Sequence, residues 1–236
     1  MPPCASRPSG AERRAVGHNG GVSHGTERQR DAERTRAELL AEATRAFAES
    51  GYSGTRVDEI AERTRTTKRM IYYYFGSKEG LYLAVLEAAY RGIRDAEREL
   101  EVGALSPVEA VRRIAEITFD HHLAHSDFIR LVAVENIHHG RFIRQIPSIR
   151  EANQPALGLL EEVLERGREQ GVFAAGIEPL EVHLLISSYC VFQVANQHTF
   201  GYIFGVEFEE PQRRERLRRM IGDVVVAWLS APRTAG

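Results

Sequence analysis

A basic stretch lies between Arg63 and Lys78, with five positive side chains and no acidic one. The chain's only two lysines, Lys68 and Lys78, are both in it. Hydroxyl groups precede the first lysine at Thr66 and Thr67, and three consecutive tyrosines follow it. A short basic helix with hydroxyls at its start and tyrosines along it has the side chains that bind phosphates and base edges in a DNA major groove.

The charge of the whole chain supports a local contact rather than a broad basic surface. The 236 residues contain 31 Lys and Arg against 33 Asp and Glu, a formal net charge of −2. A basic stretch alone is often a solvent-exposed helix face, and tyrosines are often part of a core. Here two short helices and a flanking pattern accompany the charges, which favours a nucleic-acid contact.

Four helices are expected around the basic stretch. Apolar residues recur at helical spacing from Ala32 and stop at Gly51, which indicates a first helix. A short second helix follows, then a turn at residues 64–66, a third helix, and a fourth over about 78–101. Hydroxyl side chains precede the last three and are expected as N-caps: Thr55, Thr67 and Ser77.

The pattern stays helical beyond Gly103, and the alternation typical of strands is absent. Prolines open several of these helices, where the missing N–H costs nothing. The expected helices cover residues 107–125, 126–138, 157–170, 179–199 and 211–229. The sequence therefore predicts an all-α chain with roughly ten helices.

The first 30 residues differ from the rest in composition. They are rich in Gly, Ser, Pro and Arg and contain almost no large apolar side chains, so a disordered N-terminal tail is expected over residues 1–30. The alternative is a basic arm that adds phosphate contacts. Its arginines would be Arg7, Arg13, Arg14, Arg28 and Arg30.

No segment suggests a membrane or secreted protein. A run of about 18 apolar residues is absent, and the N-terminus lacks the apolar core of a signal peptide. The two isolated cysteines, Cys4 and Cys190, argue against a disulfide framework or a structural zinc site. A cytoplasmic chain with no membrane partner, no metal and no cofactor is expected.

Residues 32–88 carry a longer pattern at fixed spacing. A first helix ending in Gly-Tyr is followed by T-x-V-x-x-I-A from Thr55 and by T-K-x-x-I-Y-Y-Y-F-x-S-K-E-x-L from Thr67. This segment resembles the DNA-binding domain of the TetR family of bacterial transcriptional regulators. Residues from about 100 to 236 resemble the family's variable ligand-binding and dimerising domain only in length and helicity.

The resemblance implies an organisation and a function. After the tail, residues 31–78 would form a three-helix helix-turn-helix DNA-binding domain. A long helix would join it to a helical effector-binding and dimerisation domain over residues 79–236. The implied function is a ligand-responsive transcriptional regulator, a repressor released from its operator by a small-molecule effector.

The resemblance also implies that the helix over residues 67–74 enters the major groove and that Lys78 contacts a phosphate. The side chains agree with this placement. Lys68 and Arg69 are expected to reach base edges, since arginine paired to guanine is the commonest specific contact. Met70 is expected to touch a thymine methyl group.

The tyrosines and Arg56 complete the expected DNA contacts. Tyr72 and Tyr74 are expected to face outward, with hydroxyls near backbone phosphates, and Tyr73 to pack partly inward. Arg56, at the start of the second helix, is expected on the opposite phosphate wall. The full set is Arg56, Thr66, Thr67, Lys68, Arg69, Met70, Tyr72, Tyr74 and Lys78.

Two departures from the family pattern affect what is carried over. The family usually has glycine in the turn between its second and third helices, where φ is often positive, and this chain has Arg65. Many relatives have small residues where the third helix here has Arg69 and Met70. The operator sequence is therefore not carried over.

Two later helices combine aromatic and polar side chains, as small-molecule pockets do, although dimer interfaces and cores have the same composition. An aromatic or apolar effector is expected there. The segment FIRLVAVENIHHGRFI also resembles regulators of nitrogen-heterocycle catabolism, such as that of pyrimidines or nicotinate, without identifying the ligand. The pocket candidates are Phe128, Glu135, Asn136, Tyr189, Phe192, Gln193 and Asn196.

The histidines raise the alternative of a metal-dependent enzyme. His121 and His125 share a helix face and have the spacing to bind a metal together. Further ligands, an HExxH motif, a nucleophile elbow and a Gly-rich phosphate loop are all missing, so hydrogen-bonded or solvated histidines are favoured and no enzyme is expected. An architectural DNA-binding protein is disfavoured by the near-neutral charge.

One recognition helix reads too few base pairs for useful specificity, so a homodimer on a near-palindromic double-stranded DNA operator is expected. The dimer contact is expected as a four-helix bundle from residues 157–170 plus 179–199 or the last helix. The sequence identifies neither the effector nor the operator, nor the regulated genes, nor whether transcription is repressed or activated.

Overall fold

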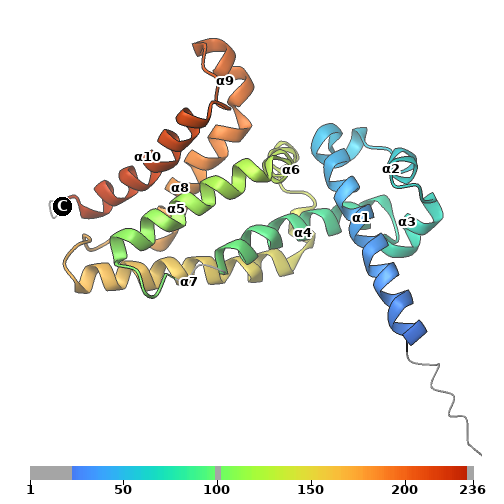
Figure 1. The fold of residues 1–236 in the computed structure, drawn as a ribbon, viewed down its shortest axis with the longest axis horizontal. Coiled ribbons are helices and arrows are strands. Elements are labelled where there is room, and N and C mark those ends of the chain that lie inside the picture. Colours follow the sequence, from blue (N-terminus) through green and yellow to red (C-terminus); the bar gives the residue numbers. More distant parts are fainter. Residues whose placement is uncertain (1–22, 99–101, 233–236) are drawn as a thin grey trace, which may run out of the picture. The chain divides into compact units, whose positions relative to one another are not determined.

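The computed structural model describes residues 23–98 and 102–232 of the 236-residue chain. Every regular element in this part is a helix (Figure 1), which confirms the predicted all-α class. In chain order the elements are α1 (Ser23–Gly54), α2 (Val57–Arg63), α3 (Lys68–Phe75), α4 (Lys78–Arg98), α5 (Pro107–Ala124), α6 (Ser126–Ile137), the 3₁₀ helix η1 (Ile143–Gln145), α7 (Pro147–Glu169), α8 (Pro179–Ala195), α9 (Gln197–Phe204) and α10 (Pro211–Ser230).

The chain divides into two compact units, Met1–Ala37 and Glu38–Gly236. In the first, α1 already begins at Ser23, and Gln29 donates a side-chain hydrogen bond to Glu33 one turn later at 3.1 Å. Such pairs support an exposed helix. Helix α1 therefore includes residues 23–30 of the segment expected as a tail, while residues 1–22 lie outside the described part.

In the second unit, the buried face of α1 anchors the helices that carry the basic stretch. Phe47 is fully buried, and its ring meets that of Tyr82 on α4 edge-on at 4.9 Å. Ile60 of α2 and Ile71 of α3 are fully buried in the same cluster. Burying side chains of this size contributes about 1.5–3 kcal/mol each, so one core holds α2 and α3 in place.

The end of α1 differs from the expected capping. Gly51 has φ 67°, so the backbone leaves helical geometry where the stop was predicted, although the assigned helix continues to Gly54. Thr55 is not the N-cap of α2, because Arg56 takes that position without a side-chain bond. The buried Thr55 hydroxyl instead lies 2.9 Å from the Ala46 carbonyl oxygen and 2.8 Å from that of Gly51. Carbonyl oxygens near the end of a helix lack intrahelical hydrogen-bond donors, and the Thr55 hydroxyl supplies a donor there.

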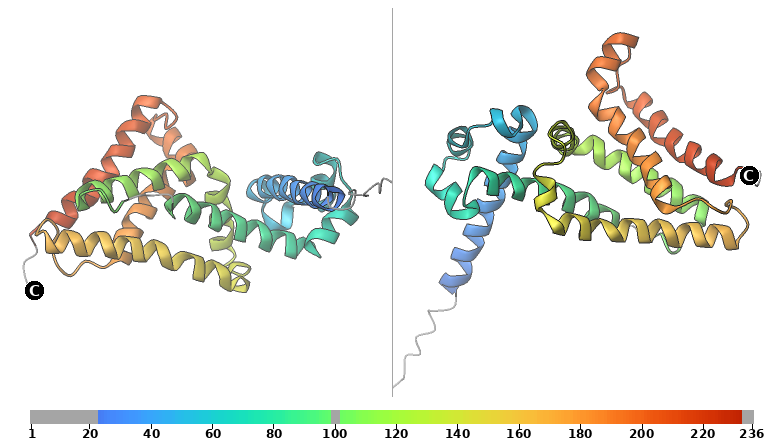
Figure 2. Two further views of the ribbon diagram at one scale, coloured as in Figure 1. Left: turned by 60° about the horizontal axis from the view of Figure 1, so that its bottom comes forward. Right: turned by 180° about the vertical axis from the view of Figure 1, so that it is seen from behind.

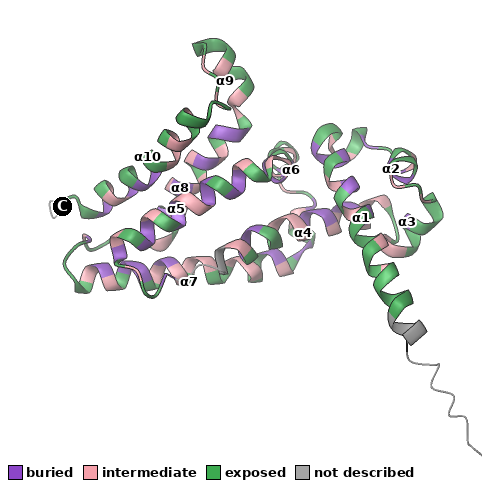
Figure 3. Ribbon diagram, in the orientation of Figure 1, coloured by how far each residue is buried: buried purple, intermediate pink, exposed green. Residues whose placement is uncertain are grey.

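A second core lies in the C-terminal half and is centred on α5. This helix packs against α10, α8 and α7, as the views in Figures 1 and 2 show. Buried positions recur along these helices (Figure 3), and most are aliphatic. They include Val111, Phe119, Val163, Ile186 and Val225.

Most of the helix starts that were predicted from proline residues are confirmed. Helices α5, α8 and α10 begin at the expected prolines. The helix expected from residue 157 instead begins at Pro147 and contains the exposed Pro155, and the helix expected over 179–199 ends at Ala195, with α9 beginning at Gln197. Within the described residues, no helix is both long and apolar enough to cross a membrane.

Candidate nucleic-acid interface and regulatory site

Helix α3 is fixed at its start and along one face. The Thr67 hydroxyl accepts a hydrogen bond from the Met70 backbone N–H at 3.3 Å, which confirms the predicted N-cap. Ile71 is fully buried in the core shared with α1, α2 and α4. The Ser77 hydroxyl accepts from the Gly80 N–H at 3.0 Å, as expected for the start of α4.

The other face of α3 is open. Thr67, Lys68, Arg69, Met70 and Tyr72 are all exposed, as a groove-contacting helix requires. Ile71 is the buried residue of this eight-residue helix. A short helix held by its apolar face and open along its basic face can enter a major groove without rearrangement of the core.

The prediction for the last two tyrosines is wrong. Tyr73 is 77% exposed, whereas Tyr74 is half-buried and packs against the core. The reason is the helical period: Tyr74 and Phe75 follow Ile71 by three and four residues and share its inward face, and Tyr73 does not. Tyr73 therefore replaces Tyr74 as a candidate DNA contact.

Ion pairs occupy two of the five cations. Lys68 Nζ lies 3.0 Å from Asp58 Oδ2, and this hydrogen bond raises the pKa of the ammonium group. Arg63 Nη1 lies 3.1 Å from Glu42 Oε1, and Glu42 also binds Arg45. Burial acts to raise the pKa of Glu42, but the two arginines outweigh it and lower the pKa. Arg63 thus ties α2 to α1.

Arg65 has the backbone conformation that the family pattern implies for glycine. Its φ is 52°, in the left-handed region. The Arg65 N–H bonds the Glu62 carbonyl at 3.2 Å and the Thr66 N–H bonds the Ala61 carbonyl at 2.9 Å. These two bonds form a Schellman motif, whose left-handed position favours glycine. The turn keeps its geometry, and an exposed arginine sits in it.

Lys78 and Arg56, the two cations on either side of α3 in the sequence, lie in different environments. Lys78 is half-buried at the start of α4, with its ammonium group 4.8 Å from the centre of the Tyr52 ring, and burial lowers its pKa. Arg56 is exposed at the N-cap of α2, with its Nε 4.0 Å from Glu59 Oε1. Thr66 is half-buried in the turn.

The seven pocket candidates separate into three groups. Glu135 and Tyr189 are engaged in the protein: Glu135 accepts from the Tyr82 hydroxyl at 3.1 Å and from the N–H groups of Phe142 and Ile143, and the Tyr189 hydroxyl donates to the Leu217 carbonyl at 3.0 Å.

Asn136 and Phe192 are exposed, and Asn196 forms the C-cap of α8. The Asn136 amide donates to the Val132 carbonyl one turn earlier on its own helix. Of the seven candidates, Phe128 and Gln193 are the two that are buried and for which no side-chain hydrogen bond to another helix is found in the described residues. Both remain pocket candidates.

Sequence reasoning considered His121 as a metal ligand but did not single out Arg94 on α4 or His183 on α8. Arg94, His121 and His122 are buried, and His183 is half-buried. Burial is the main cause that lowers the pKa of His121 and His122 to about 4, and the charge of Arg94 contributes to both shifts. The sequence feature that indicates the burial of Arg94 is its position on the apolar face of α4, next to Ile93.

His121 and His125, whose spacing is that of a metal-binding pair, lie next to each other at the end of α5. Their rings stack at 4.1 Å, and His125 Nδ1 lies 2.9 Å from the His121 carbonyl oxygen. No group of three or more potential metal ligands occurs in the described residues.

Comparison with known proteins identifies both halves of the chain. Residues 39–85 match the family of bacterial regulatory proteins named tetR, and residues 107–225 match the tetracyclin repressor-like C-terminal domain. The first match includes α2 and α3, and the second includes α5 and the helices that surround it.

The individual relatives cover different shares of the chain. It is 32% identical over 202 residues to the HTH-type transcriptional repressor NicS of Pseudomonas putida, a match that covers 86% of this chain and 95% of NicS. It is 39% identical over 67 residues to the HTH-type transcriptional regulator RutR of Escherichia coli, which covers 28% of this chain and 32% of RutR.

A solved structure agrees with the fold. The TetR family transcriptional regulator PfmR from Thermus thermophilus superposes with a TM-score of 0.55 at 25% identity, over 82% of this chain and 99% of PfmR. The chain therefore belongs to the TetR family of bacterial regulatory proteins and is a ligand-responsive, DNA-binding transcriptional regulator.

Proposed function

We propose that the chain is a repressor that binds double-stranded operator DNA as a homodimer and is released when a small-molecule effector binds its C-terminal half. We propose that the DNA-binding domain covers residues 31–78 and that the effector-binding and dimerisation domain covers residues 79–236. The name of the relative NicS, a transcriptional repressor, supports repression rather than activation.

The exposed face of α3 carries this proposal. Arg69 and Met70 point away from a core that fixes the helix through Ile71, so they can reach base edges while the fold stays unchanged. Lys68 reaches DNA only by giving up or sharing its ion pair with Asp58, which a phosphate can compensate. Tyr73 adds a ring and a hydroxyl to the same exposed surface.

The proposed dimer surface is the outer face of α8 and α10. Large apolar side chains remain exposed there: Leu184 by 66%, Met220 by 41% and Val224 by 46%. A groove between the two helices is lined by Leu184, Leu185, Val224 and Trp228, with Glu181 and Ser188. Exposed apolar patches of this kind are typical of protein–protein contacts.

The dimer surface proposed here differs from the expected one in α7. Its apolar residues Leu160, Val163 and Leu164 are buried in the core of the same chain and are not available to a partner. Two copies of α8 and α10 related by a two-fold axis would form a four-helix bundle without α7.

The proposed function is tested by selecting DNA from a random duplex pool with the full chain, followed by mobility shift with the selected duplex. A near-palindromic site bound in preference to scrambled DNA is expected, because two α3 helices would read two half-sites. Recovery of duplexes with no common sequence would reject sequence-specific regulation.

The dimer surface is tested separately by sedimentation of Leu184→Glu. A charge buried in the centre of an apolar interface is strongly unfavourable, so the variant should sediment as a monomer where the wild type is a dimer. The matched control is Ile137→Glu, since Ile137 is 72% exposed on α6, away from this surface. A dimeric Leu184→Glu variant would contradict the assignment.

A further inference from the structure

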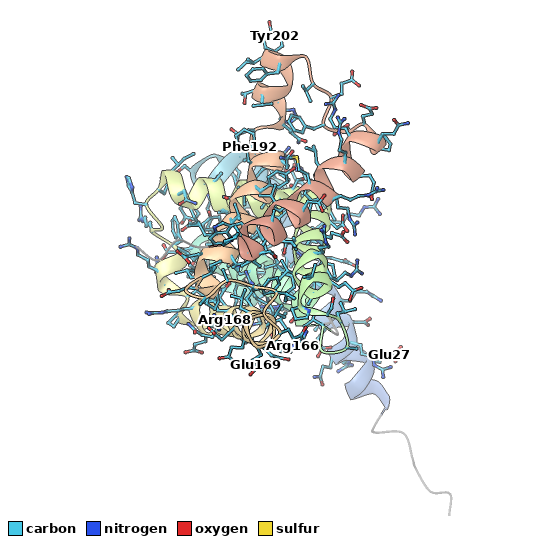
Figure 4. All side chains as sticks on the ribbon, turned by 90° about the vertical axis from the view of Figure 1, so that its left-hand side faces the viewer. Glu27, Arg166, Arg168, Glu169, Phe192 and Tyr202 are labelled. Carbon is cyan, nitrogen blue, oxygen red and sulfur yellow. The ribbon has the colours of Figure 1, made fainter. Side chains whose placement is uncertain are left out.

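Helix α9 extends from the end of α8, beyond the helices that pack around α5 (Figures 1 and 2). None of its eight residues is buried in the described part of the chain. Tyr202 is 90% exposed, Ile203 68% and Phe204 62%, and Tyr202 lies at the far end of the helix (Figure 4). An isolated helix of this length is marginal in water without packing, so these apolar side chains are expected to be covered by a partner.

Ring contacts hold residues 197–208, here called the α9 arm, in a defined conformation. The Phe200 ring lies 5.4 Å from that of Phe192 on α8 and 5.8 Å from that of Phe208 in the following loop. Gly205, in the left-handed conformation, ends the helix. Apolar side chains on an ordered element lose less conformational entropy when they bind, which favours docking of the arm.

An open apolar groove runs between α8 and α10. It has a volume of about 590 Å³. Leu184 is 66% exposed on one wall and Val224 is 46% exposed on the other. The remaining lining residues are Glu181, Leu185, Ser188 and Trp228. The groove and the α9 arm therefore both present apolar surface that a partner can cover.

A two-fold axis brings the α9 arm of one copy to the groove of the other. Exposed residues recur at every fourth position along α8, at Leu180, Leu184, Ser188 and Phe192. Where two such faces meet antiparallel across an axis near Phe192, each residue lies level with the one equally far on the other side of Phe192. Leu184 is eight residues before Phe192 and is then level with position 200, inside the partner's arm.

The composition of the arm and the exposed area favour a second copy as the partner. Helix α9 contains no Asp, Glu, Lys or Arg, so charge does not select DNA or a charged peptide. A stable interface needs about 800 Å² from each partner, and a large exposed side chain presents on the order of 200 Å². On that scale the three exposed apolar side chains of α9 add about as much area as the exposed apolar side chains of α8 and α10.

We propose that the α9 arm of each copy docks into the groove between α8 and α10 of the other copy, with Tyr202 and Ile203 inserted. This rests on the proposed function, because it extends the dimer contact proposed there. The contact is isologous, since each copy gives one arm and receives one. The Tyr202 ring fills apolar space while its hydroxyl bonds to Glu181 or Ser188, the polar residues of the groove.

The first test is sedimentation equilibrium of the full-length protein with Tyr202→Ser and Ile203→Ser combined. The dimer dissociation constant should rise at least about tenfold, because buried aromatic and aliphatic anchors dominate such contacts. The control is Ile137→Ser, which removes a side chain 72% exposed on α6 and should leave the dissociation constant unchanged. An unchanged dissociation constant in the Tyr202→Ser/Ile203→Ser variant would overturn the inference.

The second test is a cross-link, which does not depend on weakening the dimer. In a Cys4→Ser background, with Cys190 buried, oxidised glutathione should join Tyr202→Cys of one chain to Leu184→Cys of the other. A disulfide needs Cα atoms about 4.4–6.8 Å apart, so a covalent dimer on a non-reducing gel reports close approach. Ile137→Cys with Leu184→Cys is the control and should stay monomeric on the gel. Absence of a covalent dimer with Tyr202→Cys and Leu184→Cys would overturn the inference.

The oligomeric state separates this inference from the proposed function. A monomeric wild type would reject the proposed homodimer and the arm contact together. A wild-type dimer that Leu184→Glu dissociates, but that Tyr202→Ser and Ile203→Ser leave intact, would reject only the arm contact. A wild-type tetramer that the two arm substitutions reduce to a dimer would place α9 between dimers and would also overturn docking in the groove.

Discussion

Tyr73 and Tyr74 are neighbours of one residue type with opposite environments, and this difference can be measured. Tyr73→Ala should weaken DNA binding with little change in the free energy of unfolding, because its ring is 77% exposed. Tyr74→Ala should lower the free energy of unfolding by about 1–3 kcal/mol, because its half-buried ring packs on the core. Urea unfolding and mobility shift of both variants check this. Equal destabilisation would contradict the assigned faces.

Arg69 and Lys78 are expected to contribute to DNA binding in different ways. Arg69→Ala should relax base preference at one position by about 1–3 kcal/mol, because the exposed Arg69 is placed to pair with a base edge. Lys78→Ala should weaken binding to all sequences alike and reduce the salt slope by about one unit, because a phosphate contact carries no sequence information. The measurement is affinity for a panel of single-base operator variants at several salt concentrations. If both substitutions lower the affinity for every operator variant by the same factor, Arg69 is not a base-reading residue.

At the scale of elements, the turn between α2 and α3 stores strain that can be removed. Arg65 has φ 52°, a conformation that an L-residue adopts at a cost and glycine adopts freely. Arg65→Gly should therefore raise the free energy of unfolding by roughly 0.5–1 kcal/mol. Thermal melting checks this, and Arg69→Gly, at a position of α3 with helical backbone, is the control that should destabilise. Destabilisation by Arg65→Gly would show that its side chain contributes more than its backbone costs.

The sequence predicted where helices begin better than it predicted which of their faces are buried. Prolines at 107, 179 and 211 and the hydroxyl at Thr67 mark helix starts chemically, and the structure places them there. The faces of α8 were not predictable, because Leu184 and Ile186 are both apolar while one is exposed and the other buried. Periodicity fails where a helix is apolar on its outer side as well as its inner side.

The surroundings of the effector-pocket candidates were not predictable for a related reason. Composition alone identifies aromatic and polar residues but not their partners, so Glu135 and Tyr189 could not be distinguished from ligand-binding groups. Arg94 was missed because a single arginine in an amphipathic helix is usually exposed.

At the scale of the whole molecule, the buried imidazoles make stability depend on pH. His121 and His122 have a pKa of about 4 in the folded chain against an ordinary value of 6.5, so the unfolded chain binds protons first as pH falls. The free energy of unfolding should therefore fall between about pH 6.5 and 4, by at most about 1.4 kcal/mol per pH unit for each imidazole. Urea unfolding between pH 7 and pH 5 checks this, and His121→Gln should reduce the slope. A pH-independent free energy over that range would show that the imidazoles are not buried as neutral rings.

The repressor model requires that effector and operator oppose each other through one protein. Helix α4 begins with Lys78 beside α3, carries Tyr82 in its hydrogen bond to Glu135 on α6, and continues to Arg94. An effector that favours the DNA-incompetent dimer by about 1–3 kcal/mol would lower operator affinity roughly five- to 150-fold. Operator DNA must weaken effector binding by the same factor.

The most direct test of the central claim, that α3 reads an operator as part of a dimer, is anisotropy titration of a selected near-palindromic duplex with the wild type and Arg69→Ala. Two chains should bind each duplex, and the wild type should prefer it over a scrambled duplex by about 1,000-fold or more. Arg69→Ala should lose part of that preference. Binding of one chain per duplex, or equal affinity for the scrambled duplex, would contradict the account.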